Sequence, residues 1–178
     1  MAFDLVPHPD FPPRAIKSVR VRWYFARGGR FLLRFLVDGV EELDRPDFAG
    51  RARADNLWQT TCFEMFLKDE TSGQYAEFNF SPSGRWAAYL FAGYRDGRVD
   101  LELDGEPVIE CGAGQFLFAL TATMDASLLQ GVGAMGLSAV LVERDGTKSF
   151  WAAGHGQGQP DFHDAACFTV PVPAPSLR

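Results

Sequence analysis

The chain has 178 residues, of which 47% are hydrophobic, and its formal net charge is −6. This length suits one domain with its own core, so we expect a single domain over residues 1–178. The negative charge disfavours a nucleic-acid surface, which is normally basic, and no apolar run approaches the roughly 18 residues of a membrane helix.

Residues 1–14 are rich in proline and predict an extended N-terminal segment before a β-sandwich over residues 15–172. The N-terminus has no basic region followed by an apolar run, so it lacks the pattern of a signal peptide. Three cysteines, Cys62, Cys111 and Cys167, form no CxxC spacing and are typical of reduced thiols, two of them on strands. These features predict a cytoplasmic location.

Short alternating segments separated by turn residues follow one another along the rest of the chain. The predicted strands are 16–25, 31–37, 58–67, 75–81, 85–94, 99–103, 115–124, 136–143, 147–152 and 167–172. The residues between 38 and 55 predict a long loop, and one short helix over 126–130 is capped by Asp125. Many short strands with turns between them predict an all-β fold, an antiparallel β-sandwich with little helix.

The strands predicted at 58–67 and 75–81 sort their side chains by parity. One face is apolar and consists of Phe63, Met65, Leu67, Ala76, Phe78 and Phe80. The other face carries Trp58, Thr60, Cys62, Glu64, Tyr75, Glu77 and Asn79. Carboxylates, an amide and aromatic rings on one face suit a polar, ring-shaped ligand such as a sugar.

Two other interpretations of this face remain open. Glu64 and Asn79 are also compatible with a solvated sheet surface bearing cross-strand polar pairs. An acid–base pair of Glu64 and Glu77, as in glycoside hydrolysis, is disfavoured because no histidine, lysine or nucleophile shares their face. We therefore expect ligand binding without catalysis, and no catalytic residues. Trp23, Trp86 and Trp151 are expected to pack in the core or at its rim.

Motifs for nucleotides and metals are weak. Residues 131–136 match GxGxxG by letters, but a helix precedes them and a strand follows, so they predict a turn. A loop contains His155, Asp161, His163 and Asp164, whose spacing fits no zinc site and predicts a hydrogen-bond network. Asp44, Asp47 and Asp55 are interpreted as solvated acids rather than a calcium site, so no metal is expected.

Three blocks of sequence share the pattern of a known family. They are residues 57–66 (LWQTTCFEMF), residues 75–80 (YAEFNF), and a C-terminal block formed by 149–151 (SFW), 160–164 (PDFHD) and Phe168. In these blocks the chain resembles the family 9 carbohydrate-binding modules, which belong to the wider DOMON-like group of β-sandwiches.

The resemblance implies a sugar held between two aromatic rings over a polar floor. The first ring maps onto Trp58, and the second onto Phe162, where the family has tryptophan. The floor carboxylate maps onto Glu64, and the family's basic residue maps near Asn79, with Glu77 beside it. The expected ligand-binding residues are thus Trp58 and Phe162 for stacking, with Glu64, Glu77, Asn79 and His163 for hydrogen bonds.

The expected partner is a carbohydrate or a related polar small molecule, and neither a nucleic acid nor a membrane. Without an export signal, the chain is similar to freestanding bacterial DOMON-like proteins. Other members of the wider group bind haem through methionine and histidine or lysine, so a haem-binding electron-transfer domain is the alternative. No cofactor is expected, because Met65 points into the core and Met124 and Met135 lack an opposing histidine. A protein-interaction domain using the same aromatic face is a third hypothesis, and the oligomeric state stays open.

Overall fold

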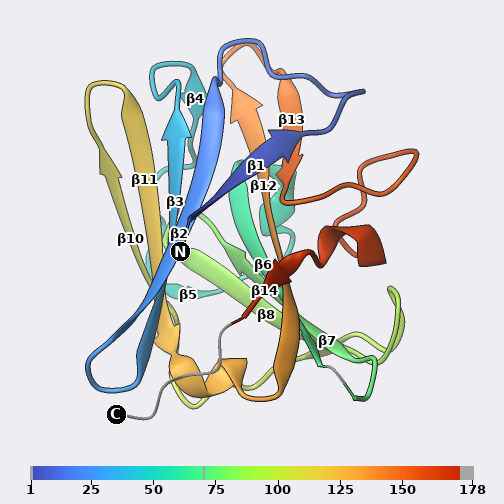
Figure 1. The fold of residues 1–178 in the computed structure, drawn as a ribbon. Coiled ribbons are helices and arrows are strands. Elements are labelled where there is room, and N and C mark those ends of the chain that lie inside the picture. The colour runs from blue at the N-terminus through green and yellow to red at the C-terminus, as the bar shows by residue number, and fades with distance from the viewer. Residues whose placement is uncertain (1, 70, 173–178) are drawn as a thin grey trace.

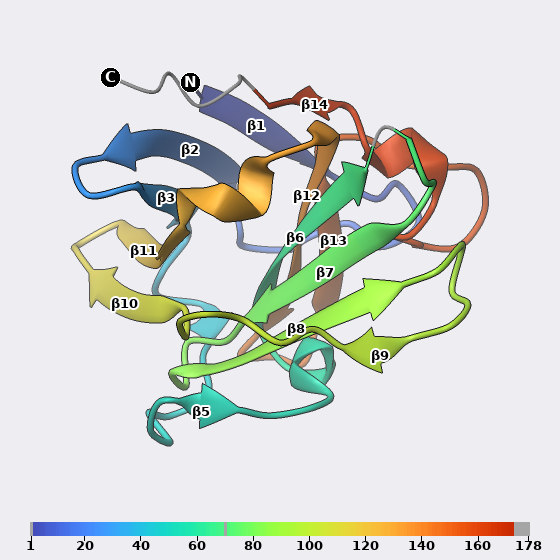
Figure 2. The same ribbon diagram turned by 90° about the horizontal axis from the view of Figure 1, so that it is seen from below.

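Two sheets pack face to face in the computed structural model, which describes residues 2–69 and 71–172 (Figures 1 and 2). The first sheet has the order β10 (Val108–Ala113), β11 (Leu117–Asp125), β3 (Arg30–Asp38), β2 (Ser18–Ala26) and β1 (Ala2–Pro7). The second continues from β1 through β13 (Lys148–Ala152), β12 (Val132–Glu143), β6 (Cys62–Asp69), β7 (Tyr75–Phe80) and β8 (Arg85–Phe91) to β5 (Ala52–Arg53). Short strands β4 (Leu43–Asp44) and β14 (Val170–Pro171) pair with β12, and β9 (Val99–Asp100) pairs with β8.

All strand pairs are antiparallel among the described residues, except β5 with β8. The prediction of an antiparallel β-sandwich with little helix is confirmed. The hairpin from β2 to β3 turns at Gly28 and Gly29, whose φ angles of 74° and 68° favour glycine. No helix in the described part of the chain is long and apolar enough to cross a membrane.

The main core lies between the two sheets and follows the alternation of the strands. Phe31, Leu33, Phe35 and Val37 of β3 are all fully buried there, as every second residue of a strand should be. The predicted apolar faces of β6 and β7 contribute Phe63, Met65, Leu67, Phe78 and Phe80, with Ala76 packed against them. Trp23, Trp86 and Trp151 are buried in the same core. Period-two alternation therefore indicated correctly which sides of these strands face inward.

A second apolar cluster covers the outer face of the second sheet. It consists of Phe66, Tyr75, Ala87, Tyr89, Phe91, Val140, Ala152 and Phe162, with Leu57, Phe150 and Phe168 packed against it. Loop residues after β8 and after β13 fold over this face, so Glu64 and Asn79 are buried rather than solvated. The interpretation of this face as a simple solvated surface is therefore wrong, and the face becomes the floor of a site.

The N-terminal strand β1 joins the two sheets. Residues 2–5 pair with β2, whereas Val6 and Pro7 pair with Ala152 and Trp151 of β13. In Figure 1 this strand crosses from one sheet to the other. The segment expected to be extended is indeed extended up to Pro7, but it pairs on both sides rather than lying along an edge.

Several predicted boundaries differ from the structure. The strand expected to begin at Trp58 begins at Cys62, because Asn56 has a left-handed φ of 58° and starts a 3-10 turn, η1 (Leu57–Gln59). The expected 38–55 loop contains the short strands β4 and β5. Strand β10 was not predicted, because its mostly exposed residues do not alternate between apolar and polar. The expected short helix is the 3-10 turn η2 (Ala126–Leu129), capped by Asp125, and the last predicted strand is divided into η3 (Ala165–Cys167) and β14.

Candidate ligand-binding site

A partly open cavity of about 540 Å³ lies on the outer face of the second sheet. Its lining comprises Asn56, Trp58, Glu64, Glu77, Asn79, Tyr89, Phe91, Arg95, Arg98, Val140, Phe150, Pro160, Phe162 and His163. All six residues expected to bind ligand are in this set, although they come from η1, two strands and the loop after β13. The fold thus brings the six residues to one cavity of the size that small-molecule sites have.

The floor is polar because β6 and β7 are paired in a particular register. Glu64 lies directly opposite Asn79, and Glu77 is two residues before Asn79 on the same face of β7. Only 3% of Glu64, 7% of Glu77 and 1% of Asn79 is exposed. Three polar side chains are therefore buried side by side, where each needs a partner.

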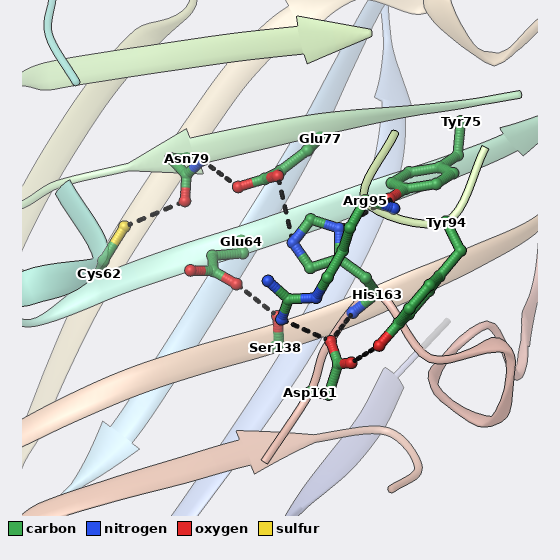
Figure 3. A network of polar contacts seen from close by, with 10 residues as sticks. All are labelled: Cys62, Glu64, Tyr75, Glu77, Asn79, Tyr94, Arg95, Ser138, Asp161 and His163. Carbon is green, nitrogen blue, oxygen red and sulfur yellow. Dashed lines mark hydrogen bonds and ion pairs between the residues drawn. The ribbon is translucent and has the colours of Figure 1, made fainter. Parts of the chain in front are cut away.

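Hydrogen bonds fix the orientation of these side chains (Figure 3). The Cys62 thiol lies 3.7 Å from Asn79 Oδ1, and Asn79 Nδ2 donates to Glu77 Oε1 at 2.7 Å. Ser138 Oγ donates to Glu64 Oε2 at 3.1 Å, whereas Oε1 of Glu64 has no hydrogen-bond partner among the described residues. One oxygen of a deeply buried carboxyl is thus left for a group inside the cavity.

The two floor carboxyls differ in how strongly their surroundings raise the pKa. Burial, and then the charge of Glu77, raises the pKa of Glu64 to about 8. Burial also raises the pKa of Glu77, but the hydrogen bond from Asn79 and the charges of Arg98 and Arg95 oppose this. Glu64 therefore holds its proton more firmly than Glu77 does, since two neighbouring buried carboxylates repel each other.

His163 is held as a neutral imidazole above the floor. Its Nδ1 lies 2.8 Å from Tyr75 Oη, and this hydroxyl accepts the backbone N–H of Arg95 at 3.1 Å. Burial, followed by the charge of Arg95, lowers the pKa of His163 to about 4. The Tyr75 hydroxyl therefore donates to Nδ1, and the ring proton sits on Nε2, 3.7 Å from Glu77 Oε2. At neutral pH this contact is not an ion pair.

Asp161 connects the two loops that roof the cavity. Its Oδ1 accepts from Arg95 Nη2 at 2.8 Å and from the backbone N–H of His163 at 3.0 Å, and its Oδ2 accepts from Tyr94. Figure 3 shows this carboxylate between the residues of the two loops. The predicted hydrogen-bond network in the C-terminal loop is present. Within residues 2–69 and 71–172, no group of histidine, cysteine and acidic side chains could hold a metal ion.

The aromatic walls differ in how open they are. Trp58 is 49% exposed, whereas Phe162 is 8% exposed and packs against Phe150, with 6.2 Å between the ring centroids. Lys148 Nζ lies 5.8 Å from the ring centroids of both Trp58 and Phe150. Trp58 therefore presents its ring to the cavity and to solvent, whereas Phe162 belongs largely to a packed cluster.

Several lining residues were not predicted from the sequence. Tyr89 and Phe91 share the parity of Ala87 on β8, so alternation places them on the same face as the floor. Arg95 and Arg98 come from the loop between β8 and β9, and the Arg98 guanidinium lies 4.7 Å from the centroid of the Tyr89 ring. No local sequence pattern indicates that these arginines line a cavity. The structure shows that Arg95 has a left-handed φ of 52° in this loop.

The methionines considered for haem lie elsewhere. Met65, Met124 and Met135 are all buried in the core between the sheets. His163 lies on the opposite side of the second sheet, with the outer cluster. The fold does not bring a methionine and a histidine together as an axial pair among these residues.

Comparisons with known proteins leave the family of this chain open. No protein-family model matches the sequence, and no curated protein matches it. A similar solved structure is that of a Bacteroides uniformis protein described as a "putative carbohydrate-binding protein". It superposes with a TM-score of 0.60 and 20% identity over 94% of this chain and 82% of the other. At this identity the likeness shows a shared fold.

Proposed function

We propose that this protein is a non-catalytic module that binds a carbohydrate or a similar polar ring in the cavity over β6 and β7. The observation that carries the proposal is the composition of this cavity, with buried hydrogen-bonding groups at the floor and aromatic rings at the sides. A sugar presents hydroxyl groups at its edge and apolar C–H groups on its faces, so it requires both. The fold shared with a protein described as carbohydrate-binding supports the same conclusion.

The residues of the cavity have complementary roles in this proposal. Trp58 stacks on one sugar face, and Phe162 contributes the edge of the opposite wall together with Phe150. Glu64, Glu77, Asn79 and His163 provide donors and acceptors for hydroxyl groups. An aromatic contact contributes roughly 1 kcal/mol beyond its buried area, so one sugar ring would bind with modest affinity.

The groups at the floor also support binding without covalent chemistry. The Cys62 thiol lies beside the carboxyls, and burial raises its pKa well above the ordinary value, which keeps it protonated. The Nδ1 atom of His163 is hydrogen-bonded to the Tyr75 hydroxyl rather than to a nucleophile. These side chains can hold hydroxyl groups, but within the described residues none is arranged as an activated nucleophile.

Titration of the purified protein with a panel of mono- and disaccharides, followed by calorimetry, tests the proposal. We expect at least one sugar to bind, and Trp58→Ala to weaken its binding by about tenfold or more, because the open wall is lost. Tyr24→Ala is the matched control, since Tyr24 is a similarly exposed aromatic residue on β2, outside the cavity. Absence of binding by every sugar, or equal binding by Trp58→Ala, would refute the proposal.

A further inference from the structure

The cavity floor has an unusual electrostatic property for a site that binds only neutral hydroxyl groups. Two acidic residues, Glu64 and Glu77, are each more than nine-tenths buried on neighbouring strands and face the same cavity. Oε1 of Glu64 has no partner among the described residues, and Glu77 Oε2 has only the 3.7 Å contact with His163. Because both residues line the cavity, a ligand bound there can donate hydrogen bonds to the carboxyl oxygens that have no close protein partner.

Charged neighbours of Glu64 do not supply this donor. The titratable and charged groups around it are Cys62 on its own strand, Glu77 on β7, Lys148 on β13, Arg95 and Arg98 on the loop after β8, and His163 on the loop after β13. The Lys148 ammonium donates to the backbone oxygens of Trp58 and Gln59, and the Arg95 guanidinium to Asp161. Arg98 stacks on Tyr89. None of the three donates a hydrogen bond to either floor carboxyl in the part of the chain that the structure describes.

We propose that the ligand carries a protonated amino group, as an amino sugar does, and that this group lies between Glu64 and Glu77, where it displaces the proton of Glu64. This inference rests on the proposed function, because it names the class of sugar that the same cavity takes. The exchange is balanced: the Glu64 carboxyl loses its proton to solvent, and the resulting carboxylate pairs with the ammonium group. No covalent bond between heavy atoms changes.

An ammonium group fits this floor better than a hydroxyl group does. It offers three N–H donors and no acceptor, whereas both floor carboxyls accept when ionised. A positive charge also removes the repulsion that keeps Glu64 protonated beside Glu77. The aromatic rings around the floor favour a cation as well, because their faces carry partial negative charge.

An acidic sugar is the opposite possibility, since Arg98 lines the cavity without an ion pair to any described carboxylate. Arg98 is exposed on its loop, however, where water and salt screen its charge. The two carboxyls are buried. A charge there, paired or unpaired, changes the free energy of binding far more than an exposed charge does. The floor therefore favours a cationic ligand over an anionic one.

Calorimetric titration with matched sugars separates these outcomes. The probes are glucose, glucosamine, N-acetylglucosamine and glucuronate, and the corresponding galactose series, at about pH 6.5, where an alkylamine is protonated. We expect an amino sugar to bind at least about tenfold more tightly than its neutral and N-acetylated counterparts. We also expect it to release close to one proton per site, measured with a pH indicator in weak phosphate buffer.

Glu64→Gln provides the second readout, because it keeps the shape of the side chain but has no proton to release. In this variant the amino sugar should release no proton and lose about tenfold or more in affinity, so that it no longer binds more tightly than its neutral counterpart. Glu110→Gln, an exposed acid on β10 outside the cavity, is the control and should behave as the wild type.

Each remaining outcome contradicts the inference in a recognisable way. Equal affinity for neutral and amino sugars without proton release refutes the ammonium site but leaves the proposed function intact. Preference for glucuronate or galacturonate refutes it in favour of Arg98. Failure of every probe to bind refutes the amino-sugar site together with the sugar-binding function on which it rests.

Discussion

At the scale of single residues, Glu64 determines the character of the cavity. It lies on β6 at a position where the sheet is covered, so its carboxyl is removed from water. Burial, followed by the charge of Glu77, raises its pKa to about 8, although the hydrogen bond from Ser138 acts in the opposite direction. A carboxyl in this environment reduces the stability of the folded chain when it ionises. Side chains that cost stability in this way are typically retained for binding rather than for folding.

The raised pKa of Glu64, about 8, predicts a pH dependence of stability. Between the ordinary pKa of glutamate and this value, the folded chain keeps a proton that the unfolded chain releases, so the free energy of unfolding falls as pH rises. One such proton gives a slope on the order of 1 kcal/mol per pH unit. Urea denaturation should show this slope most clearly between about pH 6.5 and about pH 8.

Below that window His163 acts in the opposite direction. Its pKa is lowered to about 4, so the unfolded chain binds a proton there that the folded chain does not, and stability falls as pH decreases. In Glu64→Gln the free energy of unfolding should therefore stay nearly constant above about pH 6.5, where His163 no longer contributes. The loss of stability at lower pH, which is due to His163, should remain. An unchanged slope in Glu64→Gln, with Glu110→Gln as the control, would show that Glu64 is not the group that titrates.

At the scale of elements, the site depends on two loops that cover the second sheet. The 92–98 loop follows β8, the 153–164 loop follows β13, and Asp161 bonds to Arg95, Tyr94 and the backbone of His163. The Arg95–Asp161 ion pair is partly exposed, so its direct contribution to global stability is small. Its effect is local, because it holds the histidine over the floor.

Asp161→Asn should loosen these two loops without unfolding the sandwich. We expect hydrogen exchange to accelerate several-fold or more at residues 92–98 and 153–164, because the charge-assisted bonds are weakened, while the core strands keep their protection. Asp4→Asn is the matched control, since it removes an exposed ion pair with Arg20 on the other sheet. Uniform acceleration across the core strands would contradict a local role for Asp161.

At the scale of the whole molecule, β1 holds the two halves of the sandwich together. It pairs with β2 of one sheet and β13 of the other, and Leu5 points into the core between them. Its neighbour Val6 has the opposite parity, and the two residues are 4% and 50% exposed, respectively. The chain thus contains a buried position and an exposed control on the same short strand.

Leu5→Ala should reduce the free energy of unfolding by about 2–4 kcal/mol, because it leaves a cavity where β1 meets the core. Val6→Ala should change it by less than about 0.5 kcal/mol, since its side chain is half exposed. Equilibrium urea denaturation measures both. Similar, small effects of the two substitutions would show that β1 contributes little to joining the sheets.

The fold class and the inward faces of the strands could be predicted from the sequence. Alternation in 31–37, 58–67 and 75–81 correctly places Phe35, Phe63 and Phe78 in the core, because the direction of a side chain depends only on its parity within a strand. The same parity places Glu64, Glu77 and Asn79 together on the other face. The turn at Gly28-Gly29 depends on local backbone preferences, because both residues have a positive φ angle.

Only the tertiary structure decided that this polar face is buried and that it forms a cavity. The roof comes from the 92–98 and 153–164 loops, which are joined to each other by the long-range bond between Arg95 and Asp161. Arg98 joins the lining from the first of these loops, whereas Tyr89 and Phe150 lie on β8 and β13. Local sequence determines which side of a strand a residue faces, whereas burial and charge state depend on which distant segments pack over it, and no local pattern encodes that contact.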